Sequence, residues 1–169
     1  MAAFAIGIGV WSARTLLALL CVSVVTYAHA QLSLSGGRIY QGDLDEGEPY
    51  GFGIMVYPNG THYEGQFVSG FREGRGTAIF YDGTRYEGEW RHDIPHGRGV
   101  MEWLAGERYE GDIVENTRSG RGVMVFRDGT RYEGEWRDDA MNGHGIMTLP
   151  SGERYEGLFE NGEWRNPAR

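Results

Sequence analysis

Apolar and polar side chains alternate along most of this chain, and glycines punctuate the alternation. The segment Tyr86-Glu87-Gly88-Glu89-Trp90 alternates with a period of two, as does the segment from Gly97 to Trp103. A period of two places successive side chains on opposite faces of a β-strand, and the spacing of an amphipathic helix is absent. Turn-forming pairs such as Asp82-Gly83 separate the alternating segments. The pattern therefore predicts short antiparallel strands joined by tight hairpin turns.

The same pattern recurs at a fixed interval of 23 residues, marked by Tyr40, Tyr63, Tyr86, Tyr109, Tyr132 and Tyr155. A constant interval of this kind is typical of repeat proteins, in which one small unit is stacked on its neighbours. The predicted division is a polar entry linker at 31–39, repeats at 40–62, 63–85, 86–108, 109–131 and 132–154, a half repeat at 155–164 and a tail at 165–169. We therefore expect an all-β fold, an elongated single-layer antiparallel sheet of about eleven strands built from repeated hairpins.

The alternation sorts the side chains into an apolar face and a charged face. The apolar face carries the tyrosines, a column that includes Trp90 and Trp136, a methionine-rich column, and the column Tyr57, Phe80, Trp103, Phe126 and Leu149. The opposite face carries acidic columns from the first strand of each repeat and Arg75, Arg98 and Arg121 from the second, which we expect to pair across facing strands. No helical layer is available to cover either face.

A single sheet with one uncovered apolar face is expected to bind a partner there. The predicted partner-binding residues lie in the middle repeats and are Tyr86, Trp90, Trp103, Tyr109, Tyr132 and Trp136. We expect these aromatic columns to be mostly core, with about a third of their area open along a groove. The expected partner is a protein, bound as an extended apolar peptide, or a second copy of the chain. Open strands at both ends of the sheet would also permit homo-oligomers.

The N-terminal residues 1–30 are predominantly apolar and carry a single charge, Arg14. Ala28-His29-Ala30 supplies small residues at the two positions that determine signal cleavage. These features predict a signal peptide and a secreted or exported protein. Two alternatives are an uncleaved signal anchor, a hydrophobic helix that would keep the protein at the membrane, and an organellar presequence or misassigned start.

Composition and spacing argue against several kinds of chemistry. The formal net charge is −8 and all 16 basic residues are arginine, which disfavours general binding to nucleic acid. Acid pairs such as Glu87 and Glu89 recur in almost every repeat, whereas a catalytic pair is expected once. His92 and His96 are expected in a loop with Pro95, without a cysteine to complete a metal site. We therefore predict no enzyme, no catalytic residue, no metal site and no cofactor.

Asn59-Gly60-Thr61 fits the pattern of an N-glycosylation acceptor. The same residues also fit the turn that follows the second strand of the first repeat. We favour the turn interpretation, because glycosylation additionally requires a eukaryotic secretory route.

Tyr-Glu-Gly-Glu-Trp, followed by Gly-Arg-Gly and Asp-Gly-Thr-Arg at the 23-residue interval, resembles the MORN (membrane occupation and recognition nexus) repeat. The resemblance covers residues from Tyr40 to about Trp164, with departures that include Ile113 in place of an aromatic residue. It implies a non-enzymatic array that binds protein partners or phospholipids. We therefore expect a binding or scaffold protein, the alternative being a phospholipid-binding or tethering protein held at a membrane surface by an uncleaved leader.

Overall fold

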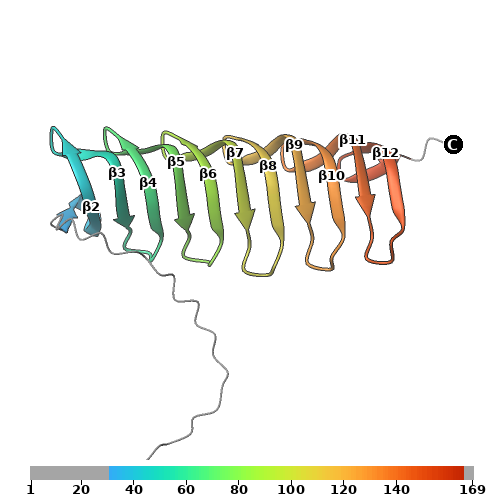
Figure 1. Cartoon of the computed structure of the whole chain (residues 1–169), viewed down its shortest axis with the longest axis horizontal. Helices are drawn as coiled ribbons and strands as arrows, with labels where there is room; N and C mark the ends of the chain where they lie inside the picture. The colour runs from blue at the N-terminus through green and yellow to red at the C-terminus, as the bar shows by residue number, and fades with distance from the viewer. Residues whose placement is uncertain (1–30, 166–169) are drawn as a thin grey trace, which may run out of the picture.

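The computed structural model describes residues 31–165, which form one open antiparallel sheet of 13 strands. Strands adjacent in the sequence are adjacent in the sheet (Figure 1). The N-terminal half consists of β1 (Leu32–Leu34), the 3-10 turn η1 (Ser35–Gly37), β2 (Arg38–Asp45), β3 (Glu48–Val56), β4 (His62–Val68), β5 (Phe71–Ile79), β6 (Arg85–Arg91) and β7 (Ile94–Glu102). The C-terminal half consists of β8 (Arg108–Val114), β9 (Thr117–Val125), β10 (Arg131–Arg137), β11 (Ala140–Thr148), β12 (Arg154–Glu160) and β13 (Glu163–Arg165).

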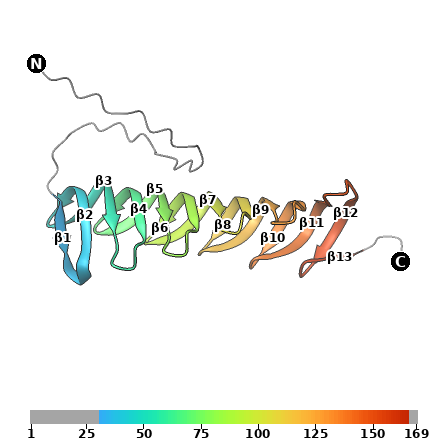
Figure 2. The ribbon, with the colours of Figure 1, turned by 90° about the horizontal axis from the view of Figure 1, so that it is seen from below.

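The predicted all-β array of hairpins is confirmed, and the two views show a ribbon much longer than it is wide (Figures 1 and 2). Two strands exceed the expected eleven. The predicted linker at 31–39 contains β1, which pairs with β2, and the predicted half repeat forms a complete hairpin of β12 and β13. The predicted leader at 1–30 lies outside the described residues. Within residues 31–165, no helix is long and apolar enough to span a membrane.

Two kinds of connection alternate along the sheet. The two-residue turns lie between the strands of each repeat, and both residues have positive φ, as at His92 (48°) and Asp93 (67°). These are the conformations of a type I′ hairpin turn. The Asp82-Gly83 pair, predicted to form the tight turn, instead lies in a five-residue connection from Phe80 to Thr84, in which Phe80 N–H donates to the Thr84 carbonyl at 2.8 Å. The location of the tight turns was therefore predicted wrongly.

A β-bulge interrupts the pairing inside each repeat from the first to the fifth, as β6 and β7 illustrate. Gly88 faces Gly99, but the next residue, Glu89, faces His96, so two residues of β7 are left without partners in β6. One of them, Gly97, has φ of 69°. The Glu89 carboxylate accepts a hydrogen bond from the backbone N–H of Arg98 at 3.2 Å and fills the space beside Gly97.

The bulge lies in a segment that was expected to be a loop. Pro95 and His96 belong instead to strand β7. Gly97 adjoins the Glu89 side chain. A bulge bends the strand and re-aims its side chains, which strict alternation does not anticipate.

Beside each bulge, a tyrosine ring lies across two glycines. A Cβ atom on Gly88 would be 2.5 Å from the hydroxyl oxygen of Tyr86, closer than real Cβ atoms approach other atoms, and Gly99 is equally confined by the same ring. The Tyr86 hydroxyl donates a hydrogen bond to the Glu89 carbonyl at 2.8 Å. The same bond, to the carbonyl three residues ahead, is made at 2.8–3.0 Å by Tyr40, Tyr63, Tyr109 and Tyr132. These five residues, the tyrosine column, are at most 1% exposed.

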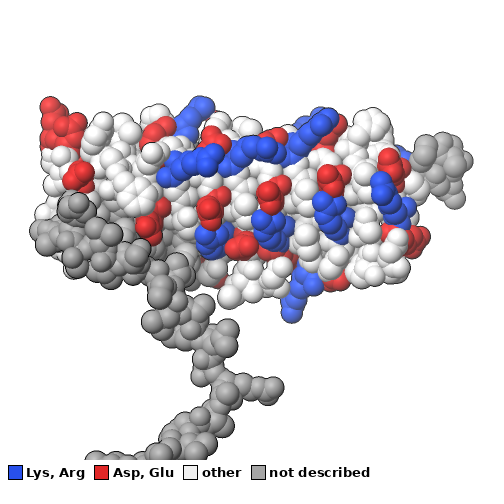
Figure 3. Space-filling model, viewed as in Figure 1, with Lys and Arg blue, Asp and Glu red and all other residues white. Residues whose placement is uncertain are grey.

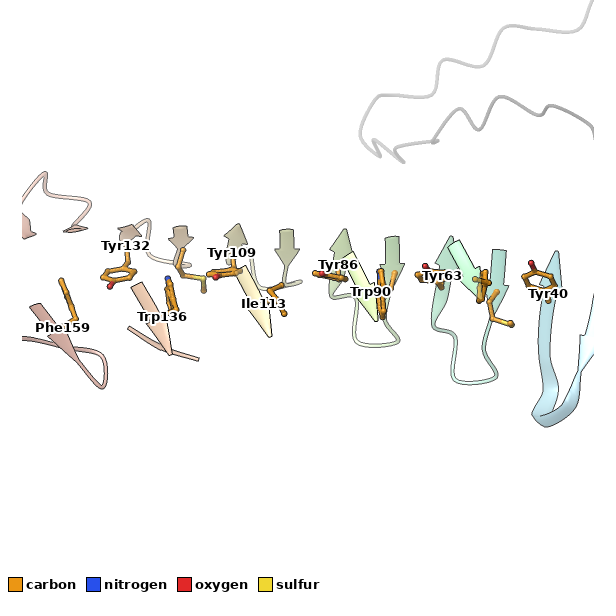
Figure 4. Packing of buried hydrophobic residues seen from close by; sticks show 13 residues of the cluster. Tyr40, Tyr63, Tyr86, Trp90, Tyr109, Ile113, Tyr132, Trp136 and Phe159 are labelled. Carbon is orange, nitrogen blue, oxygen red and sulfur yellow. The ribbon is translucent and has the colours of Figure 1, made fainter. Parts of the chain in front are cut away.

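The tyrosine column alternates with a second set of buried side chains along the array (Figure 4). Trp90 packs edge-to-face between Tyr63 and Tyr86, with ring centroids 5.1 and 5.2 Å away. The other members of this set are Phe67, Ile113, Trp136 and Phe159. Because Phe67, Trp90 and Trp136 each contact tyrosines of two neighbouring repeats, the core joins the repeats into one body. Ile113 is the one member of the set without a ring.

Burial raises the pKa of the phenol groups in the tyrosine column. For Tyr132 the pKa rises to about 12, mainly through burial and secondarily through the nearby Glu135 carboxylate. The pKa values of Tyr63, Tyr86 and Tyr109 are raised by burial in the same way. In the folded protein these hydroxyls therefore remain protonated donors above the pH at which an unfolded tyrosine ionises.

Alkaline pH should accordingly unfold the array. A tyrosine with a raised folded-state pKa contributes stability that is complete below the unfolded pKa of 10.0 and is lost as pH rises through the folded value, about 12 for Tyr132. We expect the urea midpoint to fall steeply between about pH 10 and pH 12, with tyrosinate absorbance appearing as the chain unfolds. Stability that is unchanged up to pH 12 would contradict this assignment.

Candidate functional site

The six residues predicted to contact a partner do not form one exposed surface. Exposure is 0% for Tyr86, Tyr109 and Tyr132, 3% for Trp90 and 5% for Trp136, so these five lie in the core. Trp103 alone is half-buried. The expectation that these five side chains line an open groove is therefore wrong, because the rings pack against glycine backbone and against one another.

An apolar surface does remain, one position further out. We call the outer apolar row the five half-buried side chains that begin the five-residue connections, namely Tyr57, Phe80, Trp103, Phe126 and Leu149. Four of them pack on the core with one side, Leu149 being the exception. The loop tips next to the row add Tyr81 and Leu104, which are 74% and 80% exposed.

Arg118 in β9 makes side-chain contacts with the next repeat, beside the outer apolar row. The Arg118 guanidinium lies over the Trp136 ring, with Cζ 4.5 Å from the ring centroid. Its Nε donates to Asp139 Oδ1 at 2.8 Å, and its Nη2 donates to the Asp139 carbonyl at 2.9 Å. The backbone N–H of Arg118 also donates to Asp139 Oδ1 at 3.0 Å. We call this arrangement the Arg–Trp–Asp clamp.

A second clamp has the same geometry two repeats earlier. Arg72 lies 4.3 Å above the Trp90 ring and bonds Asp93 through Nε at 2.9 Å. In the repeat between the clamps the same three positions hold Pro95, Ile113 and Asn116. There the backbone bond from Asn116 N–H to the Pro95 carbonyl persists at 3.0 Å, but the side-chain clamp is missing. The clamps therefore follow a period of two repeats.

Sequence reasoning missed Arg72 and Arg118 because it compared every repeat with every other at 23 residues. Arginine, tryptophan and aspartate each recur 46 residues apart, from Arg72 to Arg118, from Trp90 to Trp136 and from Asp93 to Asp139. A comparison of alternate repeats would have found this signal.

Two cavities lie against the outer apolar row. One, of about 250 Å³, is lined by Met101, Trp103, Tyr109, Ile113, Asn116, Arg118 and Asp139. The other, of about 410 Å³, is lined by Glu107, Phe126, Arg127, Asp128, Thr130 and Met147. Both are therefore bounded by a member of the row, Trp103 in the first and Phe126 in the second.

The charged face holds two hollows, of about 670 and 340 Å³, whose linings share Arg98 and Glu110. Rows of basic and acidic side chains along the array are visible in Figure 3. Arginines pair mainly with glutamates two residues ahead on the same strand, for example Arg108 with Glu110 at 2.7 Å. Of the arginines predicted to pair across strands, Arg98 reaches Asp112 at 3.3 Å. For Arg75 and Arg121 no ion pair is found with any residue in 31–165, so the expected pairing holds at one position of three.

The structure also locates the predicted glycosylation site and the two histidines considered as metal ligands. Asn59 is exposed in the first five-residue connection, where its Oδ1 accepts a hydrogen bond from Thr61 N–H at 2.9 Å. Glycosylation of Asn59 stays a prediction. His92 occupies a two-residue turn and His96 lies in β7. Across the described part of the chain, no group of three or more histidine, cysteine, aspartate or glutamate side chains is arranged to hold a metal ion.

The family model of the MORN repeat matches residues 40–62, 63–85, 86–108, 109–131 and 132–154. The chain therefore belongs to the MORN-repeat family, which confirms the resemblance seen in its sequence. No curated protein matches the sequence.

Similar solved structures include a TCP domain and a TCP10 domain. The TCP domain of Drosophila melanogaster SAS-4, in complex with a proline-rich motif of Ana2, is 13% identical over 89% of this chain and 92% of that chain, with a TM-score of 0.42. The TCP10 domain of Danio rerio CPAP is 15% identical over 78% of this chain and 65% of that chain, with a TM-score of 0.46. At these values the similarity says nothing about function.

Removing a clamp should destabilise the array more than removing an exposed arginine. Arg118→Ala deletes the bonds to Asp139 and the cation–π contact with Trp136, and we expect it to cost about 2 kcal/mol in urea unfolding. The matched control is Arg98→Ala, whose side chain is 76% exposed and should cost less than about 0.5 kcal/mol. Equal losses for the two variants would show that the clamp does not hold the repeats together.

Proposed function

We propose that this protein is a non-enzymatic scaffold that binds an extended segment of a protein partner along the outer apolar row. The observation that carries this proposal is the row itself. Four aromatic side chains and one leucine stand half-buried at matching positions of five successive repeats, next to two cavities. Apolar side chains that stay partly exposed in a row along one face are typical of protein interaction sites.

The charged face is the weaker candidate, although one of its hollows, of about 670 Å³, is larger than either cavity beside the outer apolar row. Several of its arginines pair with acidic side chains, as Arg131 and Glu133 do at 2.7 Å, although Arg75 and Arg121 do not pair with any residue that the structure describes. Exposed pairs of this kind gain little when they exchange partners, and salt screens them. Burial of the apolar area that the outer apolar row still exposes yields about 25 cal/mol per Å² and depends little on salt.

The spacing of the row favours an extended partner. Equivalent residues of neighbouring repeats are two strands apart, or roughly 10 Å. A polyproline II segment rises ~3.1 Å per residue and returns to the same side every third residue, after ~9.3 Å. An apolar side chain at every third position would therefore meet successive members of the row. Association of the array with itself through its ends is disfavoured, because the edge strands β1 and β13 have only three residues each.

Selection of peptides from a random display library on the full-length protein tests this proposal. We expect selected peptides to carry apolar residues three positions apart and to bind Phe80→Ser or Phe126→Ser at least tenfold more weakly. Arg98→Ala, on the charged face, is the control and should bind as the wild type does, and circular dichroism should show that each variant is folded.

Two results would contradict the binding of a peptide at the outer apolar row. Peptides that lose binding to Arg98→Ala but not to the phenylalanine variants would move the site to the charged face. Co-sedimentation of the full-length protein with phosphatidylserine vesicles, lost in Phe126→Ser while no peptide is selected, would instead favour the phospholipid-binding alternative.

A further inference from the structure

The core stack of alternating rings has one gap, and a cavity lies at the gap. In the repeats that follow Arg72 and Arg118, a tryptophan fills the space between neighbouring members of the tyrosine column. Between Tyr86 and Tyr109 the corresponding residue is Ile113, which is smaller and is 2% exposed. Ile113 and Trp103 both line the cavity of about 250 Å³. We call it the Ile113 cavity.

The Ile113 cavity has an apolar base and a polar rim. Tyr109 and Ile113 are buried and Met101 is half-buried, while the half-buried Trp103 supplies an aromatic wall. The rim is formed by Asn116 and by the Arg118–Asp139 ion pair of the second clamp, whose closest atoms are 2.8 Å apart. A metal ion would meet too few donors over this base, and the Asp139 carboxylate opposes a free anion.

The lining suits a planar aromatic group better than an aliphatic one. A cavity of about 150 Å³ is enough to hold a benzene ring, so the available volume is sufficient. Arg118 already lies over Trp136 and is 5.9 Å from the Tyr109 centroid, so its guanidinium stands where it can also face an incoming ring. Trp103 offers an edge-to-face contact, and the Asn116 amide can bond an indole N–H or a phenol hydroxyl.

We propose that the Ile113 cavity binds an aromatic side chain of the partner peptide and so fixes its register on the outer apolar row. This inference rests on the proposed function, since it names the residue type that the partner would carry at one point of the row. Four of the five repeats present similar apolar rings, which alone would allow a peptide to slide by one repeat. A single pocket between the two clamps removes that ambiguity.

The test uses N-acetyl-L-tryptophanamide as the probe and the full-length protein labelled at its methionine methyl groups. We expect a saturable shift of the Met101 methyl resonance with a Kd on the order of 1 mM, the range open to one isolated side chain. N-acetyl-L-leucinamide should bind at least threefold more weakly. Leucinamide binding as tight as that of the tryptophan probe would overturn the aromatic assignment.

Two tryptophan substitutions provide the matched comparison. Ile113→Trp installs the residue found at Trp90 and Trp136 and should fill the cavity, weakening the probe at least tenfold. Phe67→Trp makes a similar change two repeats away and should leave binding unchanged. Should Ile113→Trp fail to fold, Trp103→Ala removes the aromatic wall and should weaken the probe at least threefold. The proposal would be overturned if the wild type showed no saturable shift of the Met101 methyl resonance. It would also be overturned if the shift were unchanged in the Ile113 and Trp103 variants.

The two proposals fail in different ways. Peptides selected on the outer apolar row that neither contain an aromatic residue nor compete with the probe would leave the proposed function standing and refute the Ile113 cavity as its anchor. Probe binding without any row-dependent peptide would refute the proposed function, and with it the role of the cavity in setting a register.

Discussion

In every repeat from Tyr40 to Tyr132, a tyrosine ring lies across two glycines and donates a hydrogen bond to the carbonyl three residues ahead. This contact lets a single sheet bury its own core, since the missing glycine side chains provide the space that a second layer would otherwise enclose. It also explains why the rings are unavailable to a partner. Full burial of each ring stabilises the fold by about 2–3 kcal/mol, and the ring is shared between neighbouring repeats.

A second level of order is laid over this common core. The Arg–Trp–Asp clamps occupy alternate repeats, so the array has a structural period of 46 residues although its sequence period is 23. Between the clamps the smaller Ile113 leaves a cavity instead of a packed ring. The substitution of isoleucine for an aromatic residue at position 113 therefore coincides with the cavity that is proposed to bind the partner's aromatic side chain. In the proposed binding mode, the outer apolar row supplies affinity along the whole array, and the Ile113 cavity distinguishes one repeat from the others.

Much of the fold was predictable because alternation and glycine spacing are local. The strands, the two faces and the stacking of hairpins follow from the residues of a single repeat, such as Tyr86 to Trp90. The bulge at Gly97 was not visible, because its positive φ depends on pairing with two different strands at once. The burial of Trp90 and Trp136 was underestimated for a related reason, since their cover comes from Arg72 and Arg118. Trp103 lies half-buried in the outer apolar row, and the rest of that row depends on which columns the bent strands expose.

The most direct test of this account is a double-mutant cycle between Gly99 and Tyr86, followed by urea unfolding. The three atoms nearest a Cβ added at Gly99 all belong to the Tyr86 side chain. Gly99→Ala should therefore cost about 3 kcal/mol in the wild type and less than about 1 kcal/mol in a Tyr86→Leu background, where the ring is absent. Equal costs in both backgrounds would mean that the glycines are not needed to seat the tyrosine ring, and the central claim would be wrong.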